Sequence, residues 1–201
     1  MKAPEIALTL VSDRRRLRGG DLPGLARAAA RAGVDFVQVR EKDLPGRALR
    51  DLVAAVVRAV EGTACRVLVN GRPDVALVAG AHGVQLPEDA LAVADVKRAF
   101  PGLLVAASRH SLEGARRAED DGADVVVLGP VFATPGKERA LGIGALASAA
   151  RALRVPLHAI GGIDARNAPS VVAAGVAGIA AIRPFLEGRL EETVRALRAR
   201  P

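Results

Sequence analysis

Short apolar runs alternate with longer amphipathic segments along the whole chain. The short runs, rich in β-branched residues, are typical of buried strands, and the longer Ala-, Leu- and Arg-rich segments are typical of helices with one apolar side. The expected strands are Ile6–Val11, Val34–Val39, Arg66–Val69, Gly83–Leu86, Leu103–Ala107, Val125–Leu128, Leu157–Ile160 and Gly178–Ile182. The expected helices are Leu22–Ala32, Arg47–Glu61, Pro73–Ala79, Ala92–Phe100, Leu112–Asp121, Ile143–Leu153, Ala165–Ala174 and Phe185–Ala199.

The ends of the expected helices carry recognisable signals. Ser111 and Asp164 are good N-caps, because their side-chain oxygens accept free N–H groups of a first helical turn. A glycine follows four of the helices, at the place where a left-handed residue commonly ends a helix: Gly33, Gly80, Gly122 and Gly175. Each leads back into a β-branched run, which indicates a regular return from helix to buried parallel strand.

Eight strand–helix units predict an α/β fold, a single-domain (β/α)₈ TIM barrel over residues 1–201. An open doubly wound sheet is the alternative. That fold usually has a glycine-rich loop after its first strand, whereas here Val11 is followed by Ser12, Asp13 and Arg14. In a barrel the site lies at the carboxyl ends of the strands, and the loops after strands 7 and 8 commonly bind phosphate.

Composition excludes several classes of protein. Hydrophobic residues make up 50% and charged residues 25%, and no apolar run approaches the ~20 residues of a membrane span. The N-terminal residues show no signal-peptide pattern, so we expect a cytoplasmic protein without a membrane partner. The one cysteine, Cys65, allows no internal disulfide, and its apolar surroundings indicate a structural thiol.

Solvated helix faces, with an anionic substrate as a secondary cause, explain the positive charge better than nucleic-acid binding does. The net charge is +7, and 25 of the 29 basic residues are arginine, scattered over the polar sides of the expected helices. Aromatic residues make up only 2% of the chain, which leaves no stacking platform for single strands. We therefore expect no nucleic-acid partner.

Two glycines after the seventh strand are the clearest candidate for phosphate binding. Gly161 and Gly162 let the backbone approach an anion, and the N-terminus of a following helix would direct N–H groups at it. Ile182 and Arg183 follow the eighth strand in the same way, before another helix start. The alternative is that the glycines only make a tight turn.

A cationic motif ends the second strand. Strand alternation places Gln38, Arg40 and Lys42 on one face, toward the barrel mouth. Buried cations require an anionic partner. A substrate carboxylate or phosphate is one candidate, and internal pairing with Glu41 or Asp43 is the other.

Polar residues also follow the third, fifth and sixth strands. Asn70 suits contact with a heteroaromatic ring or a capping role, and Ser108 precedes His110, the best general acid–base group of the chain. His110 could instead make a hydrogen bond at a helix start. His82 precedes the fourth strand on the face away from the site, and His158 is expected to pack within the barrel.

The Gly/Pro-rich segment after the sixth strand contains Thr134 and ends in Lys137. Such a loop could close over an anionic ligand or form a mobile surface turn.

Together these motifs resemble the thiamine phosphate synthase superfamily over nearly the whole chain. That family has a compact (β/α)₈ barrel with Gln-x-Arg-Glu-Lys after strand 2, Gly-Pro-Val-Phe-x-Thr-Pro after strand 6 and an Ile-Gly-Gly-Ile phosphate turn. Gln38–Lys42, Gly129–Pro135 and Ile160–Ile163 match them, and Asn70 matches the pyrimidine-site asparagine. The resemblance also suggests a homodimer.

Two positions depart from the synthase. Its Asn-Asp-Arg and Gly-Gln-x-Asp stretches, after strands 3 and 4, supply aspartates that hold Mg²⁺ on a pyrophosphate leaving group. Here Gly71 has no ligand atom, and after strand 4 only Asp89 remains as a candidate metal ligand. The segments around Gly71, Gln85 and His110 instead resemble the thiazole tautomerases, a sister branch that aromatises a carboxythiazole phosphate tautomer.

This second resemblance implies an isomerase without metal or other cofactor. His110 would shuttle a proton between the ring carbon and the exocyclic carbon of a small phosphorylated thiazole. The residues that would line the substrate are Gln38, Arg40, Lys42, Asn70, Ser108, Thr134 and Lys137. Gly161, Gly162, Ile182 and Arg183 would hold the phosphate, although Arg183 departs from the usual small residue. The alternatives are a Mg²⁺-dependent synthase that uses Asp89, and a non-catalytic regulatory barrel that binds thiazole phosphate.

Overall fold

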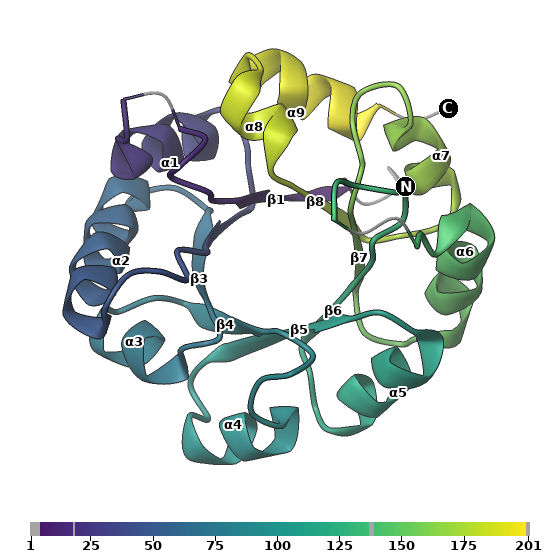
Figure 1. Cartoon of the computed structure of the whole chain (residues 1–201), viewed down its shortest axis with the longest axis horizontal. Helices are drawn as coiled ribbons and strands as arrows, with labels where there is room; N and C mark the ends of the chain where they lie inside the picture. The colour runs from purple at the N-terminus through teal and green to yellow at the C-terminus, as the bar shows by residue number, and fades with distance from the viewer. Residues whose placement is uncertain (1–4, 18, 137–138, 200–201) are drawn as a thin grey trace.

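The chain folds into a closed eight-stranded parallel barrel in which every strand pairs with its neighbours in sequence and β1 closes onto β8 (Figure 1). The structure is a computed structural model that describes residues 5–17, 19–136 and 139–199. The strands are β1 Ala7–Val11, β2 Phe36–Val39, β3 Arg66–Asn70, β4 Gly83–Leu86, β5 Leu104–Arg109, β6 Val125–Leu128, β7 Leu157–Ile160 and β8 Gly178–Ala181. The predicted TIM barrel is confirmed, and the open sheet is wrong.

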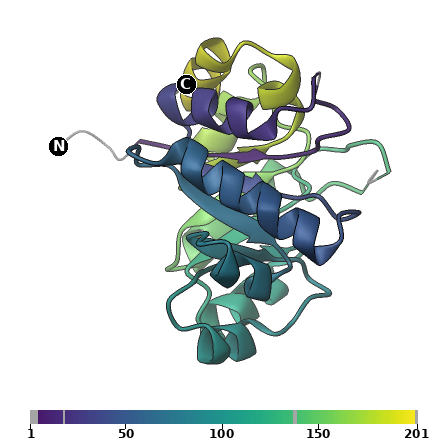
Figure 2. The ribbon, with the colours of Figure 1, turned by 90° about the vertical axis from the view of Figure 1, so that its left-hand side faces the viewer.

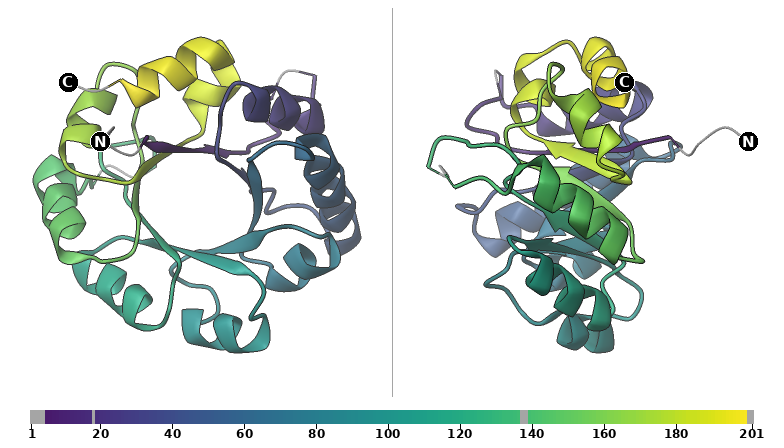
Figure 3. Two further views of the ribbon diagram at one scale, coloured as in Figure 1. Left: turned by 180° about the vertical axis from the view of Figure 1, so that it is seen from behind. Right: turned by 90° about the vertical axis from the view of Figure 1, so that its right-hand side faces the viewer.

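Helices form a ring around the barrel, as the views along its axis from either side show (Figures 1 and 3). They are α1 Leu22–Arg31, α2 Gly46–Val60, α3 Pro73–Val78, α4 Val93–Ala99, α5 Leu112–Asp120, α6 Gly142–Ala152, α7 Ala168–Ala173, α8 Arg183–Glu187 and α9 Leu190–Arg198. Ser111 caps α5 by accepting the N–H of Gly114, as predicted. The glycines expected after four helices all have positive φ: Gly33, Gly80, Gly122 and Gly175. No helix in the described ranges is long and apolar enough to cross a membrane.

Two predicted helices differ from the structure. The segment Phe185–Ala199 breaks at Gly188, where the backbone turns extended and ends α8. The Thr193 hydroxyl of α9, which begins at Leu190, donates back across this turn to the carbonyl of Pro184. The helix predicted from Ala165 begins only at Ala168, and its N-cap is Asn167 rather than Asp164. The side chain of Asn167 accepts the N–H of Asp164 and donates to the carbonyl of Gly162, which holds this stretch as a turn.

The amino ends of several strands are fastened by side chains that accept strand N–H groups. Asp35 accepts the N–H of Leu8 at 2.7 Å, and Asp124 accepts that of Val105 at 2.7 Å. His82 accepts the N–H of Val67 through Nδ1 at 3.0 Å, and partial desolvation of its ring lowers the pKa of His82. His82 therefore serves the structural end of the barrel, as predicted.

The barrel interior is a packed core and not a channel. Inward side chains of alternating strand positions, such as Val11, Leu68 and Val127, form a separate apolar cluster inside the ring of strands. The space left within is a void of about 10 Å³, bordered among others by Thr9 and His158. A ligand is therefore confined to the mouth of the barrel, where the loops after the strands meet.

His158 is a structural residue, as predicted. It is only 4% exposed, and its ring meets the ring of Phe36 edge-on with centroids 5.9 Å apart. Gly178 on the neighbouring strand makes the space, because a Cβ there would lie 2.6 Å from the imidazole. Cys65 is likewise buried, and burial raises the pKa of its thiol to about 12.

The burial of His158 predicts that the protein loses stability measurably in acid. Burial lowers its pKa from 6.5 to about 4, although the charge of Asp35 opposes the shift. As the pH falls from 6.5 toward 4, the unfolded chain takes up this proton before the folded chain does. The free energy of unfolding should therefore fall over that window, by up to about 3 kcal/mol from this residue.

The measurement is denaturant unfolding as a function of pH, on the wild type and on His158→Leu. Leucine does not titrate, so the variant should show a flatter pH dependence between pH 4 and 6.5 whatever its absolute stability. The carboxylates and His82 contribute equally to the pH dependence of both proteins. If the free energy of unfolding changes equally with pH in the wild type and the variant, the pH dependence does not come from His158.

Candidate active site

The loops at the carboxyl ends of the strands gather at one end of the barrel. In the side views, the β1–α1, β2–α2 and β6–α6 connections extend beyond the same end (Figures 2 and 3). Parallel strand direction places every βα connection here, which is where barrel enzymes carry their sites.

Gln38 presents an unsatisfied donor at this end. It is 2% exposed, and its Nε2 is the one buried side-chain nitrogen or oxygen of the described chain without a hydrogen-bond partner. Buried polar groups are normally paired, so this amide is poised for a ligand. The predicted inward orientation of Gln38 agrees with its burial.

Asn70 is the last residue of β3 and does not cap the next helix. The N-cap of α3 is Arg72, and it makes no side-chain capping bond. Asn70 instead lines a depression of about 250 Å³ together with Lys42, Gly71 and Arg72. The capping interpretation of Asn70 is therefore wrong, and its side chain is available at the mouth.

Lys42 does not lie in a strand, although the prediction that it faces the barrel mouth depended on strand alternation. β2 ends at Val39, and Lys42 stands in the turn that follows, where it is exposed. It still borders the same depression as Asn70. The alternation that orients Gln38 therefore does not reach Lys42, because the extended backbone has ended.

Ser108 accepts a 2.8 Å hydrogen bond from Nε2 of Gln85 on the adjacent strand. Gln85 is almost fully buried, and from the sequence it was used only as part of a family motif and not as a site residue. The available signal was a polar residue inside the apolar run Gly83–Leu86. This pair orients the Ser108 hydroxyl at the inner wall of the mouth.

His110 stands just beyond β5 with a defined tautomer. Its Nδ1 bonds the carbonyl oxygen of Gly129, at the end of the neighbouring strand β6. A carbonyl only accepts, so Nδ1 carries a proton and Nε2 is the nitrogen that can accept one. Nε2 lies 3.9 Å from a carboxylate oxygen of Glu88, and the side chain is half exposed. The ring is thus held by one nitrogen and open at the other.

The turn after β7 requires glycine for its own geometry. Gly161 and Gly162 have φ values of +103° and +67°. A Cβ at Gly161 would lie 2.5 Å from Pro130, and one at Gly162 would lie 2.7 Å from Phe132. The predicted helix start directly after this turn is wrong, since α7 begins at Ala168.

The neighbouring turn after β8 does lead straight into a helix. β7 and β8 are paired, which brings Ile182 and Arg183 beside the glycine turn, and α8 begins at Arg183. Arg183 is exposed and makes no ion pair or side-chain hydrogen bond within the described part of the chain.

The segment after β6 is tied to the glycine turn. Val131 donates its N–H to the carbonyl of Ile160 at 2.9 Å, and Phe132 donates to that of Gly161 at 3.0 Å. Thr134 is half-buried further along this segment. Lys137 lies outside the described residues.

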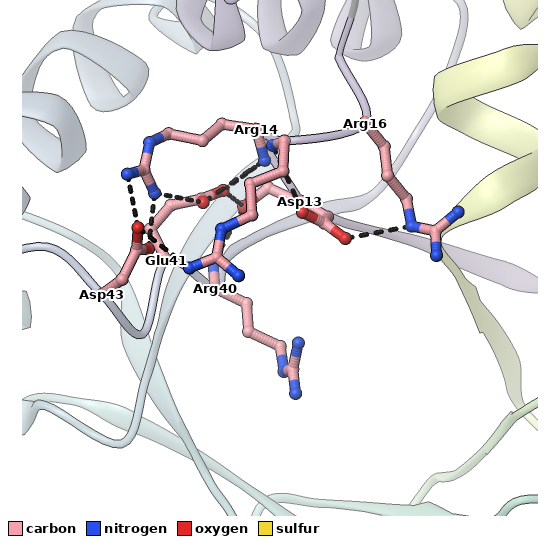
Figure 4. A network of polar contacts seen from close by, with 8 residues as sticks. Asp13, Arg14, Arg16, Arg40, Glu41 and Asp43 are labelled. Atoms are coloured by element: carbon pink, nitrogen blue, oxygen red, sulfur yellow. Dashed lines mark hydrogen bonds and ion pairs between the residues drawn. The ribbon is translucent and has the colours of Figure 1, made fainter. Parts of the chain in front are cut away.

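Arg40 extends from the end of β2 toward the barrel axis, away from Glu41 (Figure 4). Glu41 is turned back toward β1, where it accepts hydrogen bonds from Ser12 and Arg14. The predicted alternative, pairing of Arg40 with Glu41 or Asp43, is therefore wrong. Ser12 and Arg14 were not singled out as site residues, and the only available signal was their position directly after the first strand.

The carboxylates at this end do not fit a divalent metal. Gly71 has a φ of +66° and no side-chain donor, and Asp89 stands exposed in the turn after β4. Within residues 5–17, 19–136 and 139–199, no three His, Cys, Asp or Glu side chains are grouped so that they could hold an ion. Mg²⁺ takes oxygen ligands in near-octahedral geometry, for which one exposed carboxylate is a poor donor set.

Comparison with known proteins gives the family. The profile described as thiamine monophosphate synthase matches residues 8–185. The chain belongs to the thiamine monophosphate synthase family. Within that family it is 41% identical to the thiamine-phosphate synthase of Methanoculleus marisnigri, over 96% of this chain and 94% of the relative. It is 34% identical to the thiamine-phosphate synthase of Caldanaerobacter subterraneus, over 97% and 93%.

A solved structure of the same family has the same barrel. The thiamine phosphate pyrophosphorylase from Pyrococcus furiosus superposes with a TM-score of 0.87, at 31% identity, over 96% of this chain and 94% of that one. The resemblance inferred from the motifs is thereby confirmed at the level of family and fold.

Proposed function

We propose that this protein is a thiazole tautomerase, an isomerase that aromatises a carboxythiazole phosphate by proton transfer. The observation that carries the proposal is the arrangement of His110, whose Nδ1 is held by Gly129 and whose Nε2 is open at the barrel mouth. Aromatisation needs a group that removes a proton from one carbon and returns it to another. It needs no leaving-group stabilisation, which agrees with Gly71 in place of a carboxylate.

The remaining site residues have complementary tasks in this reaction. The backbone of Gly161, Gly162 and Ile182, with Arg183, would bind the substrate phosphate at the turns after β7 and β8. Arg40 would pair with the substrate carboxylate. The polar side chains of Gln38, Asn70 and Ser108, with Lys42 and the loop that carries Thr134 and Lys137, would surround the ring. Nε2 of His110 would then take the ring-carbon proton and return it to the exocyclic carbon.

The synthase is the second candidate, and the names of the relatives favour it over the isomerase. The two relatives above are named thiamine-phosphate synthase, and the Pyrococcus furiosus structure is named thiamine phosphate pyrophosphorylase. Against it stands the donor set, because Asp89 is the only candidate that remains of the expected aspartates. The residues of this chain therefore support the isomerase, and the names of its relatives support the synthase.

A paired assay separates the candidates. One arm contains the carboxythiazole phosphate tautomer with EDTA, and the other contains pyrimidine pyrophosphate, thiazole phosphate and Mg²⁺. We expect rapid aromatisation in the first arm and little thiamine phosphate in the second. Rapid coupling without aromatisation would establish the synthase instead. Tight binding of aromatic thiazole phosphate without turnover in either arm would establish a regulatory barrel.

A further inference from the structure

Arginines in this protein commonly pair with an acidic side chain close by in sequence. In the described chain, seven of them form an ion pair with a carboxylate within four residues: Arg16, Arg50, Arg72, Arg98, Arg117, Arg166 and Arg189. Arg50 pairs with its immediate neighbour Asp51. Arg40 has Glu41 beside it and Asp43 three residues on, yet pairs with neither.

Both of these carboxylates are engaged by the β1–α1 connection (Figure 4). Asp43 receives two bonds of 2.6 Å from the guanidinium of Arg14, in a bidentate fork, and the guanidinium of Arg15 lies 3.2 Å from the same carboxylate. The guanidinium of Arg14 also lies 3.2 Å from Glu41, whose side chain is only 3% exposed. One arginine therefore occupies the two carboxylates nearest to Arg40 in sequence.

Glu41 is also held by uncharged donors from β1. Ser12 donates its hydroxyl to Glu41 at 2.6 Å, and the backbone N–H of Arg14 donates at 3.1 Å. The Ser12 oxygen in turn accepts the backbone N–H of Arg40 at 2.9 Å. This chain of bonds turns Glu41 toward β1 and Arg40 toward the mouth. It also means that Glu41 keeps partners if the Arg14 side chain is removed.

The charges of Arg14 and Asp43 persist at neutral pH. The fork to Asp43, with the bond to Glu41, raises the pKa of Arg14. The same fork lowers the pKa of Asp43. Without Arg14, the nearly buried carboxylate of Glu41 would have no cationic partner in the described chain and would lie directly beside Arg40.

We propose that Arg14 is a positioning residue that keeps Arg40 free for substrate by occupying Glu41 and Asp43. This inference rests on the proposed function in one respect, namely that Arg40 binds the substrate carboxylate. Without Arg14, the guanidinium of Arg40 would fold back onto Glu41, as Arg50 does onto Asp51. The mouth would then lose the guanidinium of Arg40, although no residue of the mouth itself has been substituted.

The test measures affinity for aromatic carboxythiazole phosphate by isothermal titration calorimetry. Arg40→Gln should weaken binding by ~10-fold or more, the effect of losing a hydrogen bond between charged groups. Arg14→Ala should weaken it to a similar degree. The matched control is Arg16→Ala, which removes one positive charge two residues away, from a side chain paired with Asp13 and Glu187. The control should bind like the wild type.

Two double variants show whether Arg14 acts through Arg40. Arg14→Ala combined with Arg40→Gln should bind no more weakly than Arg40→Gln alone, because coupled effects do not add. Arg14→Ala combined with Glu41→Gln should recover binding to within ~3-fold of the wild type, since glutamine keeps the acceptor for Ser12 but offers Arg40 no charge. Circular dichroism and thermal unfolding confirm that each variant is folded at the temperature of titration.

The outcomes separate the two proposals. If Arg40→Gln binds as tightly as the wild type, the substrate role of Arg40 fails, and this inference fails with it. If Arg40→Gln weakens binding while Arg14→Ala matches the Arg16→Ala control, only the role of Arg14 is wrong. Additive losses in the double variant, or no recovery with Glu41→Gln, would also overturn it.

Discussion

Replacing His110 by alanine is expected to slow aromatisation of the carboxythiazole phosphate tautomer by ~10²- to 10⁴-fold, the usual contribution of a positioned acid–base group. The ring is the one imidazole at the mouth of the described barrel, since His82 lies at the opposite end and His158 is enclosed. Binding of the aromatic product should change little, because the phosphate and carboxylate contacts remain. The rate is measured by following the ultraviolet absorbance of the product in single turnovers.

His82→Ala is the control for this experiment. It also removes an imidazole, but at the structural end of the barrel, where Nδ1 accepts a strand N–H. This variant should keep the wild-type rate as long as it is folded. A full rate in His110→Ala would remove His110 from the mechanism, and an equal loss in both variants would indicate a general effect on the fold.

Gly161→Ala is expected to disrupt the proposed phosphate turn. Its φ of +103° is unfavourable for alanine, and the new Cβ would lie 2.5 Å from Pro130. Backbone strain and overpacking together should lower the free energy of unfolding by roughly 2–4 kcal/mol. The turn must shift to relieve the clash, so affinity for thiazole phosphate should fall by ~10-fold or more. Denaturant unfolding and calorimetric titration measure the two effects.

Gly142→Ala provides a matched comparison. Gly142 also has a positive φ, +78°, but a Cβ there would meet nothing within 4 Å. It carries the backbone strain without the clash, and its N–H bonds the carbonyl of Val131 rather than the glycine turn itself. We expect a smaller loss of stability and unchanged phosphate affinity. If Gly161→Ala behaves like Gly142→Ala in both measurements, the glycine turn is not the phosphate site.

The fold was predictable because its signals are local. Strands β4, β6 and β7 have the predicted bounds, since each is a short apolar run between turn residues. The helix-ending glycines and the Ser111 cap were found from spacing alone for the same reason. Prediction failed at the start of α7 and between α8 and α9, where side chains bond backbone carbonyls across a turn. The periodicity of a sequence does not reveal such hydrogen bonds.

The location of the candidate site residues was predictable, but their arrangement was not. Position after a strand identified Gln38, Asn70, Ser108 and His110, and the structure places all four at the mouth. The tautomer of His110, by contrast, depends on a carbonyl 19 residues away. The Gln85–Ser108 bond spans 23 residues and could not be foreseen from either segment alone.

By itself, the sequence determined the barrel, the end of it that carries the site and the residue types gathered there, because these follow from apolar periodicity and chain order. Only the tertiary structure decided which of those side chains are free. Arg40 and Glu41 are neighbours, and their spacing allowed them to pair. Arg14, 27 residues from Glu41, excludes that pairing. The choice depends on a contact between two loops, which exists only once the strands that carry them lie side by side.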